Sequence, residues 1–259
     1  MPAIVSRLRR LATSRACVRN VLLGSAAASF LGRELSAKAK GGYKTSWSGL
    51  EIDPKDLLAT NADFEKPVSV DTTEMAWASS PMPDVERKRV FLHGTKEAGK
   101  VTSVVRYAPG SSFREHPHPE GEEFLVLSGI FSDDSGDYSA GTYCLNPEGF
   151  VHAPSSKPGC EIIVRLRQHP NFEKSGLMNW LGIGSKPRKH TVVLPEEGKW
   201  LDMPSWGQNI TMKMLYSEFE KDYEDSTWLE KIGSGSTRKR IVPPGMVEEV
   251  YVVEGAVNA

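Results

Sequence analysis

Hydrophobic and polar residues along this chain alternate in short runs, as they do in β-strands. Four runs stand out, at Arg89–Leu92, Val101–Arg106, Glu122–Leu127 and Glu161–Leu166. Gly, Pro, Asp and Ser separate them, and these residues favour turns. With the weaker runs included, about eight or nine short strands follow one another, which is the pattern of an all-β sandwich or barrel.

Weaker strand patterns flank this region. Val68–Thr72 and Glu74–Trp77 precede it, and Thr191–Leu194 and Thr211–Tyr216 follow it. Both faces of the run Glu122–Leu127 are largely apolar, so we expect both to be covered by other parts of the domain.

Two histidines lie on one short strand. In a β-strand alternate side chains share a face, so His116 and His118 point the same way, and Glu122 can return to that face on the next strand. Pro117 and Pro119 cannot donate to a strand ladder, which predicts an edge or bent strand.

A third histidine, His152, follows a second glycine-bracketed apolar run. Imidazole nitrogens and one carboxylate that converge in an apolar interior can hold a divalent transition metal. A lone His-x-His pair is more often only a polar strand face. Glu122 and His152 together favour a metal site formed by His116, His118, Glu122 and His152.

The spacing of these residues resembles the two cupin motifs. The pattern G-x5-H-x-H-x3-E-x6-G is met at Gly110, His116, His118, Glu122 and Gly129. The second pattern, G-x5-P-x-G-x2-H-x3-N, is met at Gly141, Pro147, Gly149 and His152, with Ser156 in place of Asn. The surrounding sequence resembles the ChrR-like branch of the cupins over roughly residues 60 to 170. The resemblance implies a cupin barrel (double-stranded β-helix, or jelly roll) and a metal held by the four residues named above.

The resemblance leaves three functions open. With iron(II), manganese, nickel or copper, the site could serve a dioxygenase acting on a small carbonyl or enol substrate, without a separate catalytic acid or base. With zinc, it could belong to a non-catalytic sensor or scaffold. A sugar isomerase or epimerase is the third. Anti-sigma activity is not implied, because the His-x3-Cys-x2-Cys motif of the ChrR zinc domain is missing. Zinc and iron(II) are the metals we expect first.

The charge balance of the chain bears on the classes of partner it can bind. The 259 residues contain 32 Lys and Arg against 33 Asp and Glu, a formal net charge of −1. This balance points to no nucleic-acid or membrane partner. We expect a small-molecule substrate and a homodimer.

The first 40 residues differ from the rest. No acidic residue precedes Glu34, and six arginines lie among Ser, Ala and Leu: Arg7, Arg9, Arg10, Arg15, Arg19 and Arg33. This bias is typical of an organellar transit peptide, mitochondrial before plastid, which would not belong to the fold. The apolar run Val21–Leu31 leaves a secretory signal as the alternative, and a basic tail without an address as another.

The tail contains a weak echo of the first cupin motif. Gly235–Gly255 lines up with Gly110–Gly129 if one loop residue is added; Ile241 and Pro243 replace the two histidines and Glu248 remains. This predicts a second, degenerate cupin unit without a metal. The sequence ends before any counterpart of the second cupin motif, and three explanations stay open: an incomplete sheet packed on the first unit, completion by a dimer partner, and truncation. The predicted domains are therefore 1–40 transit peptide, 41–60 linker, 61–170 metal-binding cupin, 171–190 connector and 191–259 second unit.

Other polar residues are expected to be ordinary. The acidic loop Asp133–Asp137 lacks the calcium-loop pattern and is expected to be a solvated turn. His93 is interpreted as a solvated loop histidine. Cys144 and Cys160 form no Cys-x-x-Cys pair; Cys144 is expected to be a buried small hydrophobe, and a disulfide between the two is left open.

Overall fold

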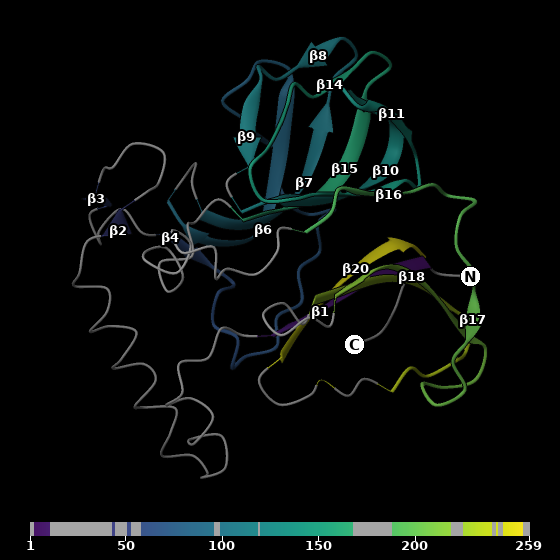
Figure 1. The fold of residues 1–259 in the computed structure, drawn as a ribbon. Coiled ribbons are helices and arrows are strands. Elements are labelled where there is room, and N and C mark those ends of the chain that lie inside the picture. Colours follow the sequence, from purple (N-terminus) through teal and green to yellow (C-terminus); the bar gives the residue numbers. More distant parts are fainter. Residues whose placement is uncertain are drawn as a thin grey trace, which may run out of the picture. The chain divides into compact units, whose positions relative to one another are not determined.

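The structure is a computed structural model of the full chain. It describes residues 3–10, 43–44, 51–52, 58–95, 99–118, 120–167, 188–218, 225–239, 242 and 246–255. Every regular element in these ranges is a β-strand (Figure 1), so the all-β prediction is confirmed. No helix long and apolar enough to cross a membrane occurs in the described part of the chain.

The chain divides into two compact units. We call Lys40–Pro195 the central unit, and Met1–Ala39 together with Glu196–Ala259 the terminal unit.

The central unit is built on an antiparallel sheet with the strand order β16-β12-β10-β15-β7-β6-β4. These strands are β4 (Leu58–Thr60), β6 (Val85–Gly94), β7 (Gly99–Tyr107), β10 (Glu122–Asp133), β12 (Tyr143–Asn146), β15 (Cys160–Arg167) and β16 (Thr191–Val193). Short strands add to its edges and ends: β5 (Ala78–Ser79), β8 (Ser111–Ser112), β11 (Gly136–Ser139) and β14 (Ser155–Ser156). Two separate two-stranded pairs are β9 (His116–His118) with β13 (Phe150–His152), and β2 (Tyr43–Lys44) with β3 (Glu51–Ile52).

Strand β10 runs through the core of this unit. Phe124 and Val126 are each 1% exposed on one face, and Leu125 is buried on the other. The Phe124 ring lies 4.6 Å from that of Phe131, in a cluster that includes Tyr138. The prediction that both faces are covered is confirmed.

Two predicted strands are wrong. Residues 61–77, which include Val68–Thr72 and Glu74–Trp77, contain no strand. Side chains, rather than a neighbouring strand, bind backbone groups of this segment: the Asp71 carboxylate accepts from the Thr73 amide at 2.8 Å, and Lys88 Nζ donates to the Thr72 carbonyl at 2.7 Å. The β-propensity of this segment is overridden by these turns and contacts.

Boundaries also differ from those expected. The segment 41–60 is not only a linker, because β4 pairs with β6. Strand β16 pairs with β12 and so belongs to the central unit, which ends at Pro195. Most of the connector 171–190 lies outside the described residues.

The terminal unit is a five-stranded antiparallel sheet with the order β17-β18-β19-β1-β20. Its strands are β1 (Ala3–Arg10), β17 (Leu201–Asp202), β18 (Ile210–Glu218), β19 (Asp225–Ile232) and β20 (Met246–Glu254). Strand β1 pairs along its length with both β19 and β20. The expectation that residues 1–40 stay outside the fold is therefore wrong for Ala3–Arg10. The number of arginines suggested a transit peptide, but it takes no account of the β-branched residues Ile4 and Val5, which favour a strand. Residues 11–40 lie outside the described residues.

Candidate metal centre

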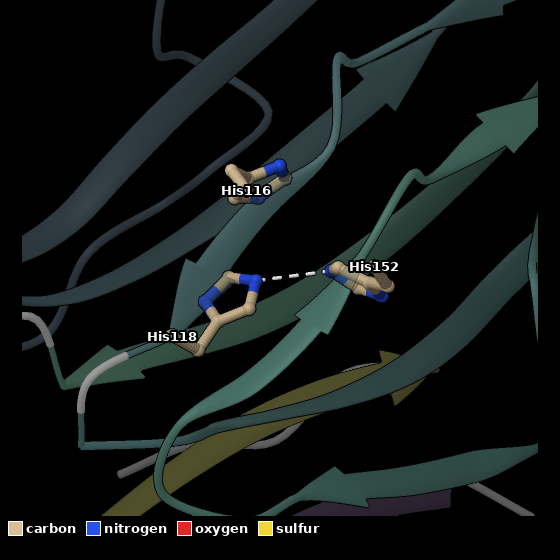
Figure 2. A group of neighbouring side chains, drawn as sticks. All are labelled: His116, His118 and His152. Atoms are coloured by element: carbon tan, nitrogen blue, oxygen red, sulfur yellow. Dashed lines mark hydrogen bonds between the residues drawn. The ribbon is translucent and has the colours of Figure 1, made fainter.

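Two paired strands present the three histidines. Strands β9 and β13 run antiparallel, with His152 opposite His116 and Phe150 opposite His118 (Figure 2). Among the described residues β13 is the only strand that pairs with β9, as the prolines predicted.

A glycine turn returns the chain from β9 to β10. Gly121 has φ +82° and donates its amide to the His118 carbonyl at 3.1 Å. A Cβ there would lie 2.8 Å from the Asn146 carbonyl oxygen, so only glycine fits. Glu122 then begins β10, on the side that faces the histidines.

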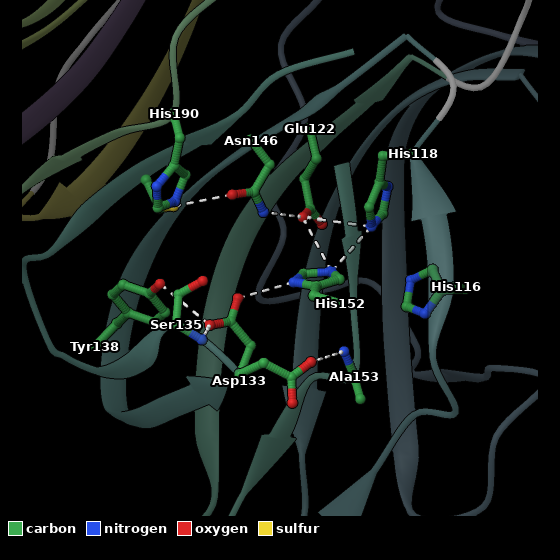
Figure 3. A network of polar contacts seen from close by, with 12 residues as sticks. His116, His118, Glu122, Asp133, Ser135, Tyr138, Asn146, His152, Ala153 and His190 are labelled. Carbon is green, nitrogen blue, oxygen red and sulfur yellow. Dashed lines mark hydrogen bonds and ion pairs between the residues drawn. The ribbon is translucent and has the colours of Figure 1, made fainter. Parts of the chain in front are cut away.

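The candidate ligand atoms converge. His118 Nε2 and His152 Nε2 are 3.0 Å apart, and Glu122 Oε2 lies 3.5 Å from each (Figure 3). One nitrogen from each of His116, His118 and His152 falls within 4.8 Å of the others. Nitrogen ligands about 2.1 Å from one ion, at octahedral or tetrahedral angles, lie about 3.0 to 3.4 Å apart. The closest distances therefore match the coordination shell of a single ion.

The other ring nitrogens are fixed by acceptors. His116 Nδ1 donates to the Arg114 carbonyl at 2.8 Å, and His152 Nδ1 donates to Asp133 Oδ2 at 2.9 Å. A proton on Nδ1 leaves the Nε2 lone pair for a metal. The Nδ1 of His118 is buried without a hydrogen-bond partner among the described residues.

The expectation of a solvated acidic turn is wrong for Asp133. Its side chain is fully buried, and it also accepts from the Ser135 amide at 2.8 Å and the Tyr138 hydroxyl at 3.2 Å. The rest of the loop, residues 134–137, is exposed as expected, and Asp134 accepts from the Ala153 amide at 3.3 Å. No spacing in the sequence links Asp133 to His152, because the contact depends on the pairing of β10 with β14, the strand that follows β13, where Ser132 lies opposite Ser155.

Burial and hydrogen bonds act on the imidazoles in opposite directions. Burial lowers the pKa of His118, which favours the neutral ring that a metal requires. Burial alone would also lower the pKa of His152, but the Asp133 hydrogen bond and the Glu122 charge outweigh it and raise that pKa. Burial works against the charge of Asp133 too, yet its hydrogen bonds hold its pKa below the usual value, so it remains a carboxylate.

Sequence reasoning missed Asn146. This residue is fully buried at the end of β12, opposite Glu122, and its Nδ2 donates to Glu122 Oε2 at 3.0 Å. Cys144 Sγ in turn donates to Asn146 Oδ1 at 3.4 Å. Cys144 is buried as expected, and neither it nor Cys160 is in a disulfide.

The remaining histidines behave differently from one another. His93 is exposed as expected, although it lies on β6 rather than in a loop. His190 stacks on Phe150 with ring centroids 5.1 Å apart, close to the site but not part of the three-histidine cluster.

Comparison with known proteins decides the family of this region. Residues 65–170 match the family described as ChrR Cupin-like domain. Residues 65–170 are a ChrR-like cupin domain. The jelly-roll prediction is thereby confirmed for this cupin domain, which contains all four predicted site residues. With three converging histidines, it is a metal-binding cupin.

Parts of solved structures resemble the chain. Rhodobacter sphaeroides SigE in complex with the anti-sigma ChrR matches at 18% identity and TM-score 0.31, over 37% of this chain and 50% of that one. A putative acetylacetone dioxygenase from Methylibium petroleiphilum matches at 20% identity and TM-score 0.35, over 39% and 77%. An RmlC-like cupin protein from Ralstonia eutropha matches at 12% identity and TM-score 0.36, over 48% and 93%. This chain thus spans half the length of the ChrR-complex chain it resembles. No curated protein matches its sequence.

Proposed function

We propose that this cupin domain holds one divalent transition metal through the Nε2 atoms of His116, His118 and His152 and a carboxylate oxygen of Glu122. The observation that carries the proposal is the position of Glu122 Oε2, 3.5 Å from the Nε2 atoms of both His118 and His152. A buried carboxylate between two imidazole nitrogens is well placed to share a cation with them.

Neighbouring groups prepare these donors. Asp133 and the Arg114 carbonyl hold protons on the Nδ1 atoms of His152 and His116. Asn146 orients the Glu122 carboxylate. Such outer contacts fix ligand direction before a metal arrives, which lowers the cost of assembling the site.

The donor set of three nitrogens and one oxygen suits zinc or iron(II) first, with manganese, nickel and copper as alternatives. When bound, a redox-active ion of this kind would polarise a carbonyl or enol and activate dioxygen. Four protein ligands leave positions free in a six-coordinate ion.

One side of the site supports access for a small molecule. His116 is only half-buried, whereas His118 and His152 are each 1% exposed. Aromatic rings lie beside the histidines: the Phe113 ring centroid is 5.7 Å from that of His116, and the Phe150 centroid is 5.7 Å from that of His152. These rings would contact the apolar part of a substrate and limit water. We therefore propose a metal-dependent dioxygenase acting on a small carbonyl or enol compound.

A zinc-bound sensor or scaffold is the second candidate. The deep burial of His118, His152 and Glu122, at most 7% exposed, favours it, because structural zinc sites are closed to solvent. The nature of the metal distinguishes the two candidates.

The test is metal analysis of the full chain purified without chelators. Wild-type protein should carry one ion per chain, and His118→Ala should lose metal affinity by about tenfold or more. His93→Ala is the matched control, since it removes an exposed histidine of the same domain and should keep the metal. Unchanged metal content in His118→Ala would contradict the site.

Dioxygen consumption with a simple β-diketone then separates the functions. Iron or manganese with uptake that is absent in His118→Ala supports the dioxygenase. Stoichiometric zinc without uptake supports the sensor or scaffold. The homodimer expected from the sequence stays a prediction, which light scattering of the full chain would test.

A further inference from the structure

The terminal sheet repeats part of the central sheet. Its order β17-β18-β19-β1-β20 matches β5-β6-β7-β15-β10 strand for strand. Four of the five matched strands, β17, β18, β19 and β20, follow one another along the chain as β5, β6, β7 and β10 do. The match of β20 with β10 agrees with the alignment of Gly235–Gly255 with Gly110–Gly129. The exception is β1, which takes the place of β15 although it comes from the other side of the sequence.

Side-chain contacts repeat as well. Lys88 on β6 donates to the Thr72 carbonyl at 2.7 Å, and Lys213 on β18 donates to the Glu197 carbonyl at 3.0 Å. Each lysine also lies over an indole: Lys88 is 4.4 Å from the Trp77 ring and Lys213 is 5.8 Å from the Trp200 ring. A second cation from the next strand, Arg106 or Lys231, lies over the same indole in each unit.

Strand β1 resembles β15 in sequence. Ile4–Arg9 reads I-V-S-R-L-R and Ile162–Arg167 reads I-I-V-R-L-R, so four of six residues are identical. In the terminal sheet, Arg7 lies opposite Thr227 on β19 and Glu249 on β20.

The pairing register is also the same. In the central sheet Arg165 lies opposite Thr102 and Glu123, the residues that align with Thr227 and Glu249. The two sheets even share an irregularity: the β10–β15 register shifts between Val126 and Ser128, and the β1–β20 register shifts at the matching point, beside Ala3. A strand that paired by chance would not reproduce both register and bulge.

We infer that residues 3–10 are the missing strand of a second cupin sheet, and that the slot between β19 and β20 is a binding site specific for this segment. Strand β1, with its three arginines, is thus a structural part of the terminal sheet. Its removal as a presequence would leave unpaired edges on β19 and β20.

Disulfide trapping in the full chain tests this register. Residues opposite one another in an antiparallel pair have Cα atoms about 4.5 to 5.5 Å apart, within the range of a disulfide. In a Cys17→Ser background, Ser6→Cys with Val250→Cys joins an opposite pair. Ser6→Cys with Glu249→Cys is the control, because adjacent residues in a strand point to opposite faces.

Under mild oxidation the first variant should form an intramolecular disulfide at least about fivefold more completely than the control. Peptide mapping by mass spectrometry identifies the bond. Equal yields in both variants would overturn the register. A bond that forms only between two chains would overturn the assignment to the same chain.

A second inference rests on side-chain contacts in the terminal sheet. Glu248 aligns with Glu122, and Arg238 Nη2 lies 3.6 Å from its carboxylate. Arg238 also binds the fully buried Glu230 through Nε at 3.2 Å and Nη2 at 3.0 Å, and Trp228 Nε1 donates to Glu230 at 2.8 Å. We propose that the Arg238 guanidinium replaces a metal ion as the countercharge of the surviving site carboxylate.

Arg238→Met tests this replacement, with Lys239→Met as the control because Lys239 is a neighbouring exposed cation. Removing the guanidinium takes its positive charge away from two buried carboxylates. The denaturation midpoint of the terminal sheet should fall in Arg238→Met, and adding Glu230→Gln and Glu248→Gln should recover at least half of the loss. A midpoint unchanged from wild type, or no recovery in the triple variant, would overturn the proposal.

Discussion

His152 is held from both ends of its ring. Nε2 faces His118 and Glu122, while Nδ1 donates to the buried carboxylate of Asp133. A carboxylate behind a metal-ligating imidazole orients the ring and makes it a stronger donor. Asp133 is therefore a positioning residue of the metal centre.

Replacing Asp133 with Asn should weaken metal binding by about 10- to 100-fold, because the charge behind His152 is lost while the side-chain shape is kept. Competition with a chromophoric chelator measures this affinity. Asp134→Asn is the matched control, since the exposed Asp134 accepts from the Ala153 amide rather than from His152. Equal affinity in Asp133→Asn and Asp134→Asn would contradict the positioning role.

The convergence of His116, His118 and Glu122 could be predicted because strand alternation and a glycine turn are local rules. His116 and His118 share a face by periodicity alone, and Glu122 follows from a turn. Asp133 and Asn146 could not, because their partners His152 and Glu122 are brought close by strand pairing rather than by spacing.

Among the elements, the join between β10 and β15 is the most constrained. Gly129 has φ +73° and lies opposite Cys160 next to the register shift. A Cβ at Gly129 would overlap the Gly159 carbonyl oxygen and lie 2.8 Å from the Cys160 Cα. Both obstacles are backbone, so β15 would have to move.

Gly129→Ala should lower the free energy of unfolding of the central unit by at least about 2 kcal/mol more than Gly110→Ala. Gly110 has a similar φ of +80°, but a Cβ added there would meet no atom within 4 Å, so it isolates the cost of the backbone conformation. Urea denaturation followed by tryptophan fluorescence measures both. Equal losses would show that the close approach of β15 costs nothing.

Elements with strong alternation, such as β7 and β15, were predictable, and Val68–Thr72 was not. Its β-branched residues suggest a strand, but the Lys88 ammonium and the Asp71 turn hold its backbone instead. Strand β1 was not predicted, because its arginines suggest a targeting peptide rather than a strand. The strands that pair with it lie more than 200 residues further along the chain, so no local pattern indicates the pairing.

At the scale of the whole molecule, two copies of one sheet have diverged in charge. The central unit gathers histidines around Glu122, and the terminal unit places Arg238 against Glu248. A cation is supplied from solution in the first case and by the chain itself in the second. Only the central unit should therefore respond to metal.

Chelation tests this asymmetry. A ligand that binds only the folded state stabilises it by about 2.7 kcal/mol at 100 times its dissociation constant. Removing metal should thus speed hydrogen exchange in peptides from β9, β10 and β13 and leave β18 and β19 unchanged. His118→Ala supplies the control, because it should exchange like the chelated wild type and ignore the chelator. Loss of protection in β18 and β19 to the same degree would mean that the terminal sheet depends on metal after all, and that Arg238 is not its countercharge.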